Sequence, residues 1–236
     1  MEKIFFVENT IGSAWFRILN LIVETGNDFY DEGRPLRELN GIKLTIRRPD
    51  HKDGFIWSVG NKKVIELFRK SFLGSEKWLE DVDIVQNFGK NDAISYSVRL
   101  FDYEGFDQVE NIIERLVKIP ESKRCMIITP LPHRDWKLDY LPCIDTIHFL
   151  TREDKINTYI HCRGLDFAQK AYANFICLAE LQSYVLNEII KRGGSKKYRL
   201  GTMDIMIDSA HIYSDTLPIA KKLIEKGRKY NEKSGA

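Results

Sequence analysis

The sequence predicts a single α+β domain that spans residues 1–236. Three observations lead to this fold class. Apolar residues recur at helical spacing in several segments, and other segments alternate apolar with polar residues as strands do. One helical pattern, over residues 167–192, is long and apolar enough to form a central core helix. No repeat, low-complexity tract or linker divides the chain.

Helices and short strands alternate in the N-terminal half. The first amphipathic helix is predicted by four apolar residues at positions i, i+3, i+4 and i+7, namely Trp15, Ile18, Leu19 and Ile22. It should end near Gly26, and the polar stretch 26–41 is typical of a loop. Alternation over 42–46 predicts a half-buried strand. Two further segments have helical spacing, 62–73 and 107–118.

Strand patterns and the core helix make up the C-terminal half. The apolar run 125–129 predicts a buried strand, and a loop with three prolines then leads to Cys143. Residues 144–150 and 156–162 predict a hairpin that turns at a charged loop. The core helix follows and should end at the glycine pair 193–194. We expect the polar segment 221–236 to fray at its end.

Composition excludes several classes of protein. Hydrophobic residues make up 43% of the 236 residues and charged residues 30%, which is a globular balance rather than a disordered one. The net charge of +2 favours neither a nucleic-acid nor a membrane partner. No apolar run is long enough to span a bilayer, and so we expect a cytoplasmic protein. The four cysteines have no metal-ligand spacing, and we expect no metal.

Four short motifs in the second half contain residue types that do chemistry. In chain order they are Ser122-Lys123-Arg124, Pro142-Cys143, Arg163-x-x-Asp166 with Asn174 eight residues later, and Ala210-His211-Ile212-Tyr213. Taken singly, none of them is specific, because a lone cysteine is most often structural and a lone arginine is most often a surface charge. Their occurrence together in one order favours a shared site.

This set of motifs resembles that of the thymidylate synthase family. Members of the family have a Ser-Arg-Arg segment, a Pro-Cys nucleophile, an Arg-Ser-x-Asp motif followed by an asparagine, and a His-x-Tyr. The resemblance covers roughly residues 15–220, and Tyr96-Ser97-Val98-Arg99-Leu100 is similar to a Tyr-Gly-x-Arg-Leu motif of the smaller members. It implies a mixed sheet packed against a long central helix, with the sheets of two subunits stacked across a homodimer interface.

The resemblance implies that Cys143 is the nucleophile. The thiolate is the reactive form, and a nearby guanidinium such as that of Arg163 favours it. In the family, the thiolate attacks C6 of a pyrimidine ring, and C5 then couples to the one-carbon unit of methylenetetrahydrofolate, the co-substrate. Loss of the C5 proton and of the folate leaves an exocyclic methylene. Tyr96 is a further catalytic candidate, and Glu66 resembles a general base that acts through water.

Binding roles also follow from the resemblance. Arg163 should bind the phosphate of a pyrimidine nucleoside monophosphate, because guanidinium groups match phosphate geometry. Lys123 and Arg124 should reach the same phosphate in the partner subunit's site. An arginine of the N-terminal loop should complete the cluster, and we favour Arg34 over Arg37.

Base and sugar should be recognised by three other residues. Asn174 stands where the family reads the pyrimidine edge, and its amide can match either uracil or cytosine. His211 and Tyr213 occupy alternate positions of an extended stretch, so their side chains should point to the same face. There, both can hydrogen-bond a sugar hydroxyl. Asp166 resembles the carboxylate that contacts folate.

Two departures from the family pattern bear on the substrate and the product. Lys123 replaces an arginine and Gly164 replaces a serine, as in cytidylate hydroxymethylases, which motivates the hypothesis of a ribonucleotide substrate such as CMP. Residues 170–172 replace a Gly-x-Pro, and the C-terminal segment has no apolar clamp. A less closed site favours water as the final nucleophile and hence a hydroxymethyl product.

Two alternatives remain open from the sequence. One is a thymidylate synthase that methylates dUMP to dTMP. The other is a non-catalytic nucleotide- or RNA-binding module, which the intact motifs and the near-neutral charge disfavour.

Overall fold

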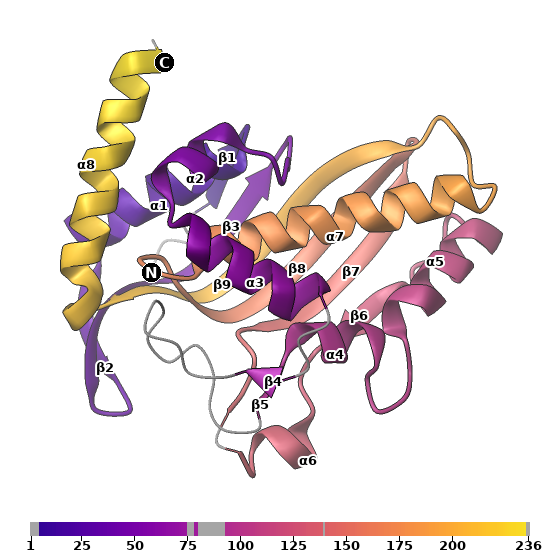
Figure 1. Cartoon of the computed structure of the whole chain (residues 1–236), viewed down its shortest axis with the longest axis horizontal. Helices are drawn as coiled ribbons and strands as arrows, with labels where there is room; N and C mark the ends of the chain where they lie inside the picture. Colours follow the sequence, from indigo (N-terminus) through magenta and orange to yellow (C-terminus); the bar gives the residue numbers. More distant parts are fainter. Residues whose placement is uncertain (1–4, 75–77, 80–92, 139, 235–236) are drawn as a thin grey trace.

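The computed structural model describes residues 5–74, 78–79, 93–138 and 140–234 (Figure 1). The helices are α1 (Ile11–Thr25), α2 (Gly54–Val59), α3 (Lys62–Leu73), α4 (Tyr96–Phe101), α5 (Gln108–Lys118), α6 (Pro132–Asp135), α7 (Ala171–Lys191) and α8 (Leu217–Ser234), with a 3-10 turn at Ser214–Thr216. The strands are β1 (Phe5–Glu8), β2 (Asn27–Asp31), β3 (Arg34–Ile46), β4 (Trp78–Leu79), β5 (Ala93–Ile94), β6 (Met126–Ile128), β7 (Ile144–Arg152), β8 (Lys155–Asp166) and β9 (Arg199–Tyr213). No helix among these residues is long and apolar enough to cross a membrane.

A mixed sheet forms the framework. Within the described residues its strand order is β1-β3-β9-β8-β7-β6, and β2 pairs with β3 at one end of that strand. The β1–β3 and β8–β9 pairs are parallel, and the other pairs of this sheet are antiparallel. The expected α+β class with a mixed sheet is therefore confirmed.

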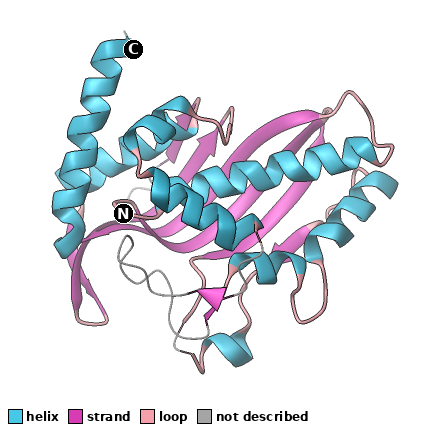
Figure 2. Cartoon of the chain, viewed as in Figure 1, coloured by secondary structure: helices cyan, strands magenta, loops and turns pink. Residues whose placement is uncertain are grey.

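Helices cover one face of this sheet, with α7 against the central strands and α3 crossing over α7 (Figures 1 and 2). The core helix is confirmed, because the apolar face predicted for it is buried along its length. Trp15 of α1 is fully buried and donates its indole N–H to the carbonyl oxygen of Phe167 at 3.0 Å. This bond fixes the loop between β8 and α7.

The opposite face of the sheet has no helix packed on it among the described residues. Strand register aligns two rows of side chains across this face. One row is Met126, His148, Tyr159, Asp204, Thr45 and Val7, and the other is Ile128, Thr146, His161, Met206, Lys43 and Phe5. Six of these residues are exposed large hydrophobic ones. We refer to these two rows as the open sheet face.

The expectation of a loop over 26–41 is wrong, because this stretch forms the β2–β3 hairpin. The turn residues Glu32 and Gly33 have φ values of 48° and 83°. Positive φ at both turn positions is the geometry that matches the twist of two-residue hairpins. Every residue of β2 is exposed, so the strand shows no apolar alternation that could have revealed it.

The polar segment 221–236 belongs to α8 as far as Ser234, and its last two residues, where fraying was expected, lie outside the described residues. Four buried residues recur along this helix, Ala220, Leu223, Ile224 and Gly227. Tyr230 packs edge-on against Phe55 with ring centroids 5.3 Å apart. This narrow apolar stripe was hidden by the lysines around it.

Two boundaries differ from the predictions. The core helix begins at Ala171 rather than near residue 167, because the four preceding residues form a turn. The run 125–129 is an edge strand rather than a fully buried one, since Met126 and Ile128 are 49% and 44% exposed. The helices at 62–73 and 108–118 and the β7–β8 hairpin are confirmed.

A buried ion pair ties α4 to the segment that leads to Cys143. The guanidinium of Arg99 donates to both oxygens of Asp135 at 2.6 and 2.8 Å, and both side chains are at most 1% exposed. Arg99 also donates to the carbonyl oxygen of Thr129, and Asp135 accepts from the backbone N–H of Leu131. The pair thus fixes the chain over 129–135.

The substitution Arg99→Met should lower the free energy of unfolding by about 3–5 kcal/mol, because it leaves the Asp135 carboxylate buried without its partner. Urea unfolding measures this loss. The matched control is Arg192→Met, since the Arg192–Glu110 pair is also bidentate but exposed, and it should cost less than about 1 kcal/mol. Equal losses in the two variants would contradict the importance of the buried pair.

Candidate active site

The ends of three neighbouring strands lie side by side and carry predicted site residues. Cys143 directly precedes β7, and its carbonyl oxygen accepts the backbone N–H of Arg163 at 3.0 Å. Gly164 pairs with Ser209, and Asp166 pairs with His211. Because β7 runs antiparallel to β8 and β9 runs parallel to it, the start of β7 lies beside the ends of the other two strands.

Arg163 is joined to the loop that presents Cys143. Its Nε donates to the carbonyl oxygen of Pro142 at 3.0 Å and its Nη2 to that of Leu141 at 2.6 Å. Burial works to lower the pKa of Arg163, but the neighbouring Cys143, Tyr96 and Asp145 raise it by more. The guanidinium is therefore a permanent positive charge next to the thiol.

Tyr96 lies on the other side of the same loop. Its hydroxyl accepts the backbone N–H of Ile144, the residue after Cys143, at 2.9 Å. Burial holds the pKa of Tyr96 well above its ordinary value, and the proximity of Cys143 adds to the effect. The phenol therefore stays protonated at neutral pH and keeps a proton that it can donate.

The four cysteines differ in accessibility. Cys125, Cys162 and Cys177 are buried, whereas Cys143 is half-buried. Burial raises the pKa of each of the three buried thiols, which makes them poor nucleophiles. Cys143 is thus the cysteine that combines solvent access with a neighbouring guanidinium.

His211 and Tyr213 lie together at the end of β9, as the sequence predicted. Their rings are 5.0 Å apart. His211 Nδ1 lies 3.2 Å from the carbonyl oxygen of Ser209, which can only accept, so Nδ1 is the protonated nitrogen. Burial lowers the pKa of His211. A neutral ring with Nδ1–H leaves Nε2 as an acceptor for a hydroxyl group.

Arg34 packs on the same tyrosine. Its guanidinium lies 3.7 Å from the centroid of the Tyr213 ring and donates to both carboxylate oxygens of Asp215 at 2.7 and 2.8 Å. The Tyr213 hydroxyl donates to Asp31 at 2.8 Å. Arg37, the second candidate of this segment, is bound to Asp28 and to the carbonyl oxygen of Val23. Of the two arginines, Arg34 is therefore the one that the fold brings to Tyr213.

Asn174 and Asp166 flank the start of α7. Asn174 is 3% exposed, and its Oδ1 is a buried acceptor without a hydrogen-bond partner. Leaving a buried acceptor unpaired costs about 1–3 kcal/mol, so such an atom needs an explanation. Asp166 is also buried, and its Oδ1 accepts the backbone N–H groups of Ala168 and Gln169. The Asp166 carboxylate thus shapes the turn before the helix.

Glu66 is less closely connected to the other candidates. Its carboxylate accepts from Arg69 at 3.3 Å, and Arg69 is itself bound to Glu180 of α7. Its charge helps to raise the pKa of Cys177, three residues after Asn174. Glu66 thus lies near α7, but no contact within the described ranges joins it to Asn174 or to Cys143.

Lys123 and Arg124 are exposed at the start of β6. Across the described ranges, neither side chain has a hydrogen bond or ion pair to Cys143 or Arg163. Their backbones are bonded, Lys123 to His148 on the open sheet face and Arg124 to Ser122. The fold does not bring these two cations into the site of their own chain.

Three neighbours of the site were missed by sequence reasoning. Tyr140 lies near Cys143, and burial raises its pKa. Asp31 and Asp215 hold Tyr213 and Arg34. The position of Tyr140 in the proline loop before Cys143 was a usable signal, but the two acids are isolated residues in polar segments and gave none.

Limiting iodoacetamide should label Cys143 first, as peptide mapping by mass spectrometry can establish. Arg163→Ala should change the rate of this labelling, because it removes the two hydrogen bonds that hold the loop presenting Cys143. Arg192→Ala removes an exposed arginine elsewhere and should leave the rate unchanged. First labelling at Cys125, or an unchanged rate in Arg163→Ala, would count against the site.

Comparison with known proteins identifies the family. The family model described as "Thymidylate synthase" matches residues 52–233. Three similar proteins, each described as "Putative thymidylate synthase", come from Methanococcoides burtonii, Methanothermobacter marburgensis and Methanopyrus kandleri. Their identities to this chain are 29%, 28% and 30%; the alignments cover 92%, 92% and 89% of this chain and 92%, 96% and 92% of the relatives.

The members of this family transfer one-carbon units to a nucleoside monophosphate, use methylenetetrahydrofolate as co-substrate and are typically dimeric. The matched region contains the strand-end residues Cys143, Arg163 and His211, and also Asn174 of α7. The chain therefore belongs to the thymidylate synthase family of one-carbon transferases.

Proposed function

We propose that this enzyme hydroxymethylates C5 of a pyrimidine ribonucleoside monophosphate, CMP or a close relative. The observation that carries the choice of a ribonucleotide is the space beside His211. A Cβ atom at Gly164 would lie 3.5 Å from Cε1 of His211 and would clash with nothing. The glycine is therefore not required by packing, and it leaves room for a 2′-hydroxyl next to the sugar-binding histidine.

Recognition of the base rests on Asn174. Its unpartnered Oδ1 is suited to accept a hydrogen bond from the edge of a pyrimidine. The side-chain amide can be flipped, so N3–H of uracil and the amino group of cytosine are both suitable donors. Binding of the base would satisfy the buried acceptor.

The sugar and phosphate would be held by the other strand ends. His211 Nε2 can accept a hydrogen bond from a ribose hydroxyl. The Tyr213 hydroxyl can give up its hydrogen bond to Asp31 and bind a ribose hydroxyl instead. In the structure, the guanidinium of Arg34 is hydrogen-bonded to the carboxylate of Asp215. To bind the phosphate, Arg34 would break these hydrogen bonds. Arg163 contributes a permanent positive charge and further N–H donors.

In the proposed reaction, the thiolate of Cys143 adds to C6 and electron density moves to C5. C5 bonds to the one-carbon unit and then loses its proton, and the bond to the carrier amine breaks. Water adds to the exocyclic methylene with loss of the thiolate from C6, which gives the hydroxymethyl product. Tyr96, with a proton held by its raised pKa, and Glu66, through ordered water, are the proposed proton donor and acceptor.

Asp166 fits the role of a contact to the co-substrate. Its Oδ2 makes one long hydrogen bond, from Gln169 at 3.3 Å, and a carboxylate oxygen can accept more than one. Methylenetetrahydrofolate supplies the one-carbon unit when bound. The helix α8 packs on α1 and α2, where Lys226 donates to the carbonyl oxygen of Val59. This placement supports access of water to the reacting carbon.

A homodimer with shared sites belongs to the same proposal. The open sheet face exposes six large hydrophobic residues among polar ones, and burial of their apolar surface is favourable. Lys123 and Arg124 lie at the border of this face and make no contact within their own site. They are placed to bind the phosphate in the partner's site.

Mass spectrometry of CMP, dCMP, UMP and dUMP after incubation with methylenetetrahydrofolate tests the function. We expect one CH₂O unit to be added to a ribonucleotide. Gly164→Ser should lower the preference for ribo- over deoxynucleotide about tenfold, because the added side chain fills the space for the 2′-hydroxyl. Gly54→Ser adds a side chain that also fits without a clash and should not change the preference.

Addition of one CH₂ to dUMP, with oxidation of the folate, would instead establish a thymidylate synthase, the activity that the names of the relatives favour. Retention of C5 deuterium in every nucleotide would establish a binding module.

Shared sites can be tested by mixing two inactive variants. Cys143→Ala lacks the nucleophile. The double variant Lys123→Ala/Arg124→Ala lacks the two side chains that bind the phosphate in the partner's site. After unfolding and refolding together, random pairing makes half of the dimers mixed, each with one intact site, and so about a quarter of wild-type activity should return. Absence of recovery would place the two cations outside the partner's site.

A further inference from the structure

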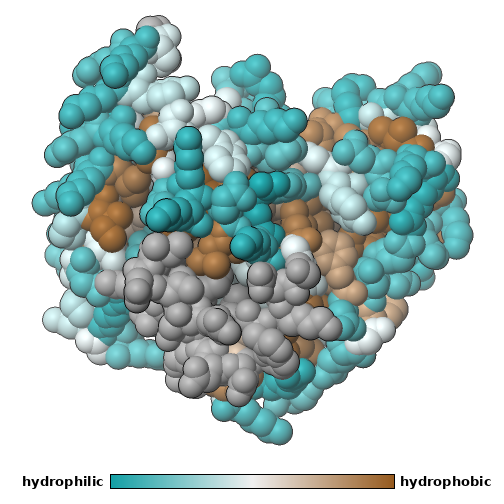
Figure 3. Space-filling view, in the orientation of Figure 1, coloured by the Kyte–Doolittle hydropathy of each residue, from teal (hydrophilic) through white to brown (hydrophobic). Residues whose placement is uncertain are grey.

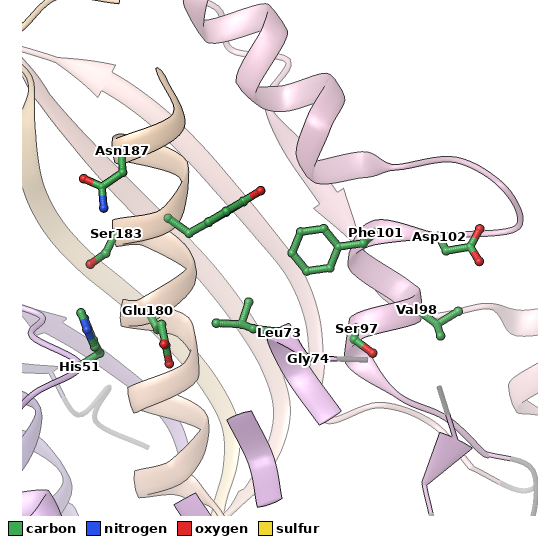
Figure 4. Close-up of a pocket in the computed structure, with 11 residues that line it drawn as sticks. His51, Leu73, Gly74, Ser97, Val98, Phe101, Asp102, Glu180, Ser183 and Asn187 are labelled. Carbon is green, nitrogen blue, oxygen red and sulfur yellow. The ribbon is translucent and has the colours of Figure 1, made fainter. Parts of the chain in front are cut away.

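A cavity lies in the helical layer, away from the strand ends. It has a volume of about 570 Å³ and lies between the end of α3, the helix α4 and the second half of α7 (Figure 4). None of Cys143, Arg163, Asn174 or His211 lines it. Its volume is within the range of small-molecule sites. On the helical side of the molecule, Figure 3 shows hydrophobic surface in the hollows between these helices.

One wall of the cavity is apolar and aromatic. Leu73, Val98, Phe101 and Tyr184 line it, and Figure 4 shows Phe101 directed from α4 toward α7. The rings of Phe101 and Tyr184 meet edge to face with centroids 6.1 Å apart. Tyr184 is 42% exposed, so part of its ring is available to a ligand. This wall is suited to a planar aromatic molecule.

Other lining residues of the cavity offer hydrogen-bonding groups. Ser183 and Asn187 follow one another at i and i+4 on α7 and both line the cavity. His51 approaches from the loop before α2, and its Nδ1 is buried without a hydrogen-bond partner. An imidazole with unused capacity can donate or accept according to its tautomer. A ligand with ring nitrogens and N–H groups would use it.

The charges around the cavity select against anions. Its two charged lining residues are Glu180 and Asp102, and neither lysine nor arginine lines it. Arg69 neutralises Glu180 with two hydrogen bonds of 2.7 Å from outside the lining. Asp102 is exposed, and its carboxylate has no hydrogen bond or ion pair among the residues described. A positive group at this end would gain an ion pair, and the aromatic rings would also favour it.

We propose that this cavity is an effector site for a neutral or cationic aromatic amine. Each helix that lines it also carries a candidate residue of the nucleotide site, with Asn174 on α7, Tyr96 on α4 and Glu66 on α3. A ligand that separates or tightens these helices changes the position of the three candidates together. The effect on the nucleotide site rests on the proposed function, whereas binding in the cavity does not.

The test is calorimetric titration of the full chain with 2-aminoquinoline and with quinoline-2-carboxylate, two bicyclic probes of similar shape and different charge. We expect saturable binding of the amine and at least about tenfold weaker binding of the carboxylate. Ser183→Trp fills the cavity and should abolish binding. Ser58→Trp changes an exposed serine of α2 and should have no effect. Asp102→Asn should weaken binding of the amine about two- to fivefold.

Coupling is measured by titrating CMP in the presence and absence of the saturating amine, where we expect at least about a threefold change in affinity. No binding of the amine, or equal binding by Ser183→Trp, overturns the site, and equal binding of the carboxylate overturns its charge selectivity. An unchanged CMP affinity overturns the coupling alone. If CMP does not bind to either form, the proposed function fails, while the amine titration still decides whether the cavity is a site.

Discussion

The buried pair of Arg99 and Asp135 is the constraint on which the geometry around Cys143 depends. The two charges lie in the interior and neutralise each other, and their remaining donors and acceptors bind backbone groups on both sides. A charged pair in a dry interior tolerates little change in geometry, because any separation exposes an uncompensated charge to a low dielectric. The chain over 129–135 is therefore held against α4, and Tyr96 on that helix meets the residue after Cys143.

The parts of the fold with strong periodicity were predictable, and those that depend on partners were not. The helix over 171–191 and the hairpin of β7 and β8 bury wide apolar faces, which leave a clear pattern in the sequence. The exposed strand β2 is defined instead by its turn and by pairing with β3, so its composition resembles a loop. The helix α8 buries only four small or aliphatic residues, and its many lysines hid that stripe.

The site shows the same division. Cys143, Arg163 and His211 stand in short motifs next to strands, and strand register was enough to bring them to one edge. Asp31 and Asp215 reach Tyr213 and Arg34 from positions more than 180 residues apart in the chain, and no local pattern encodes such a contact. The exposure of Glu66 and the use of Asp166 in a turn likewise depend on packing, which sequence spacing does not report.

The central place of β9 has a consequence for the synthesis of the protein. This strand pairs with β3, whose residue Ile46 meets Met203, and it is among the last elements to leave the ribosome. Until then β3 has an unpaired edge and the apolar face of α1 lacks part of its cover, which are features that promote aggregation of nascent chains. Pairing of β3 with β9 is also slow, because the two strands are far apart in the sequence. His211 arrives with the strand that closes the sheet, so a partly synthesised chain lacks one part of the proposed nucleotide site.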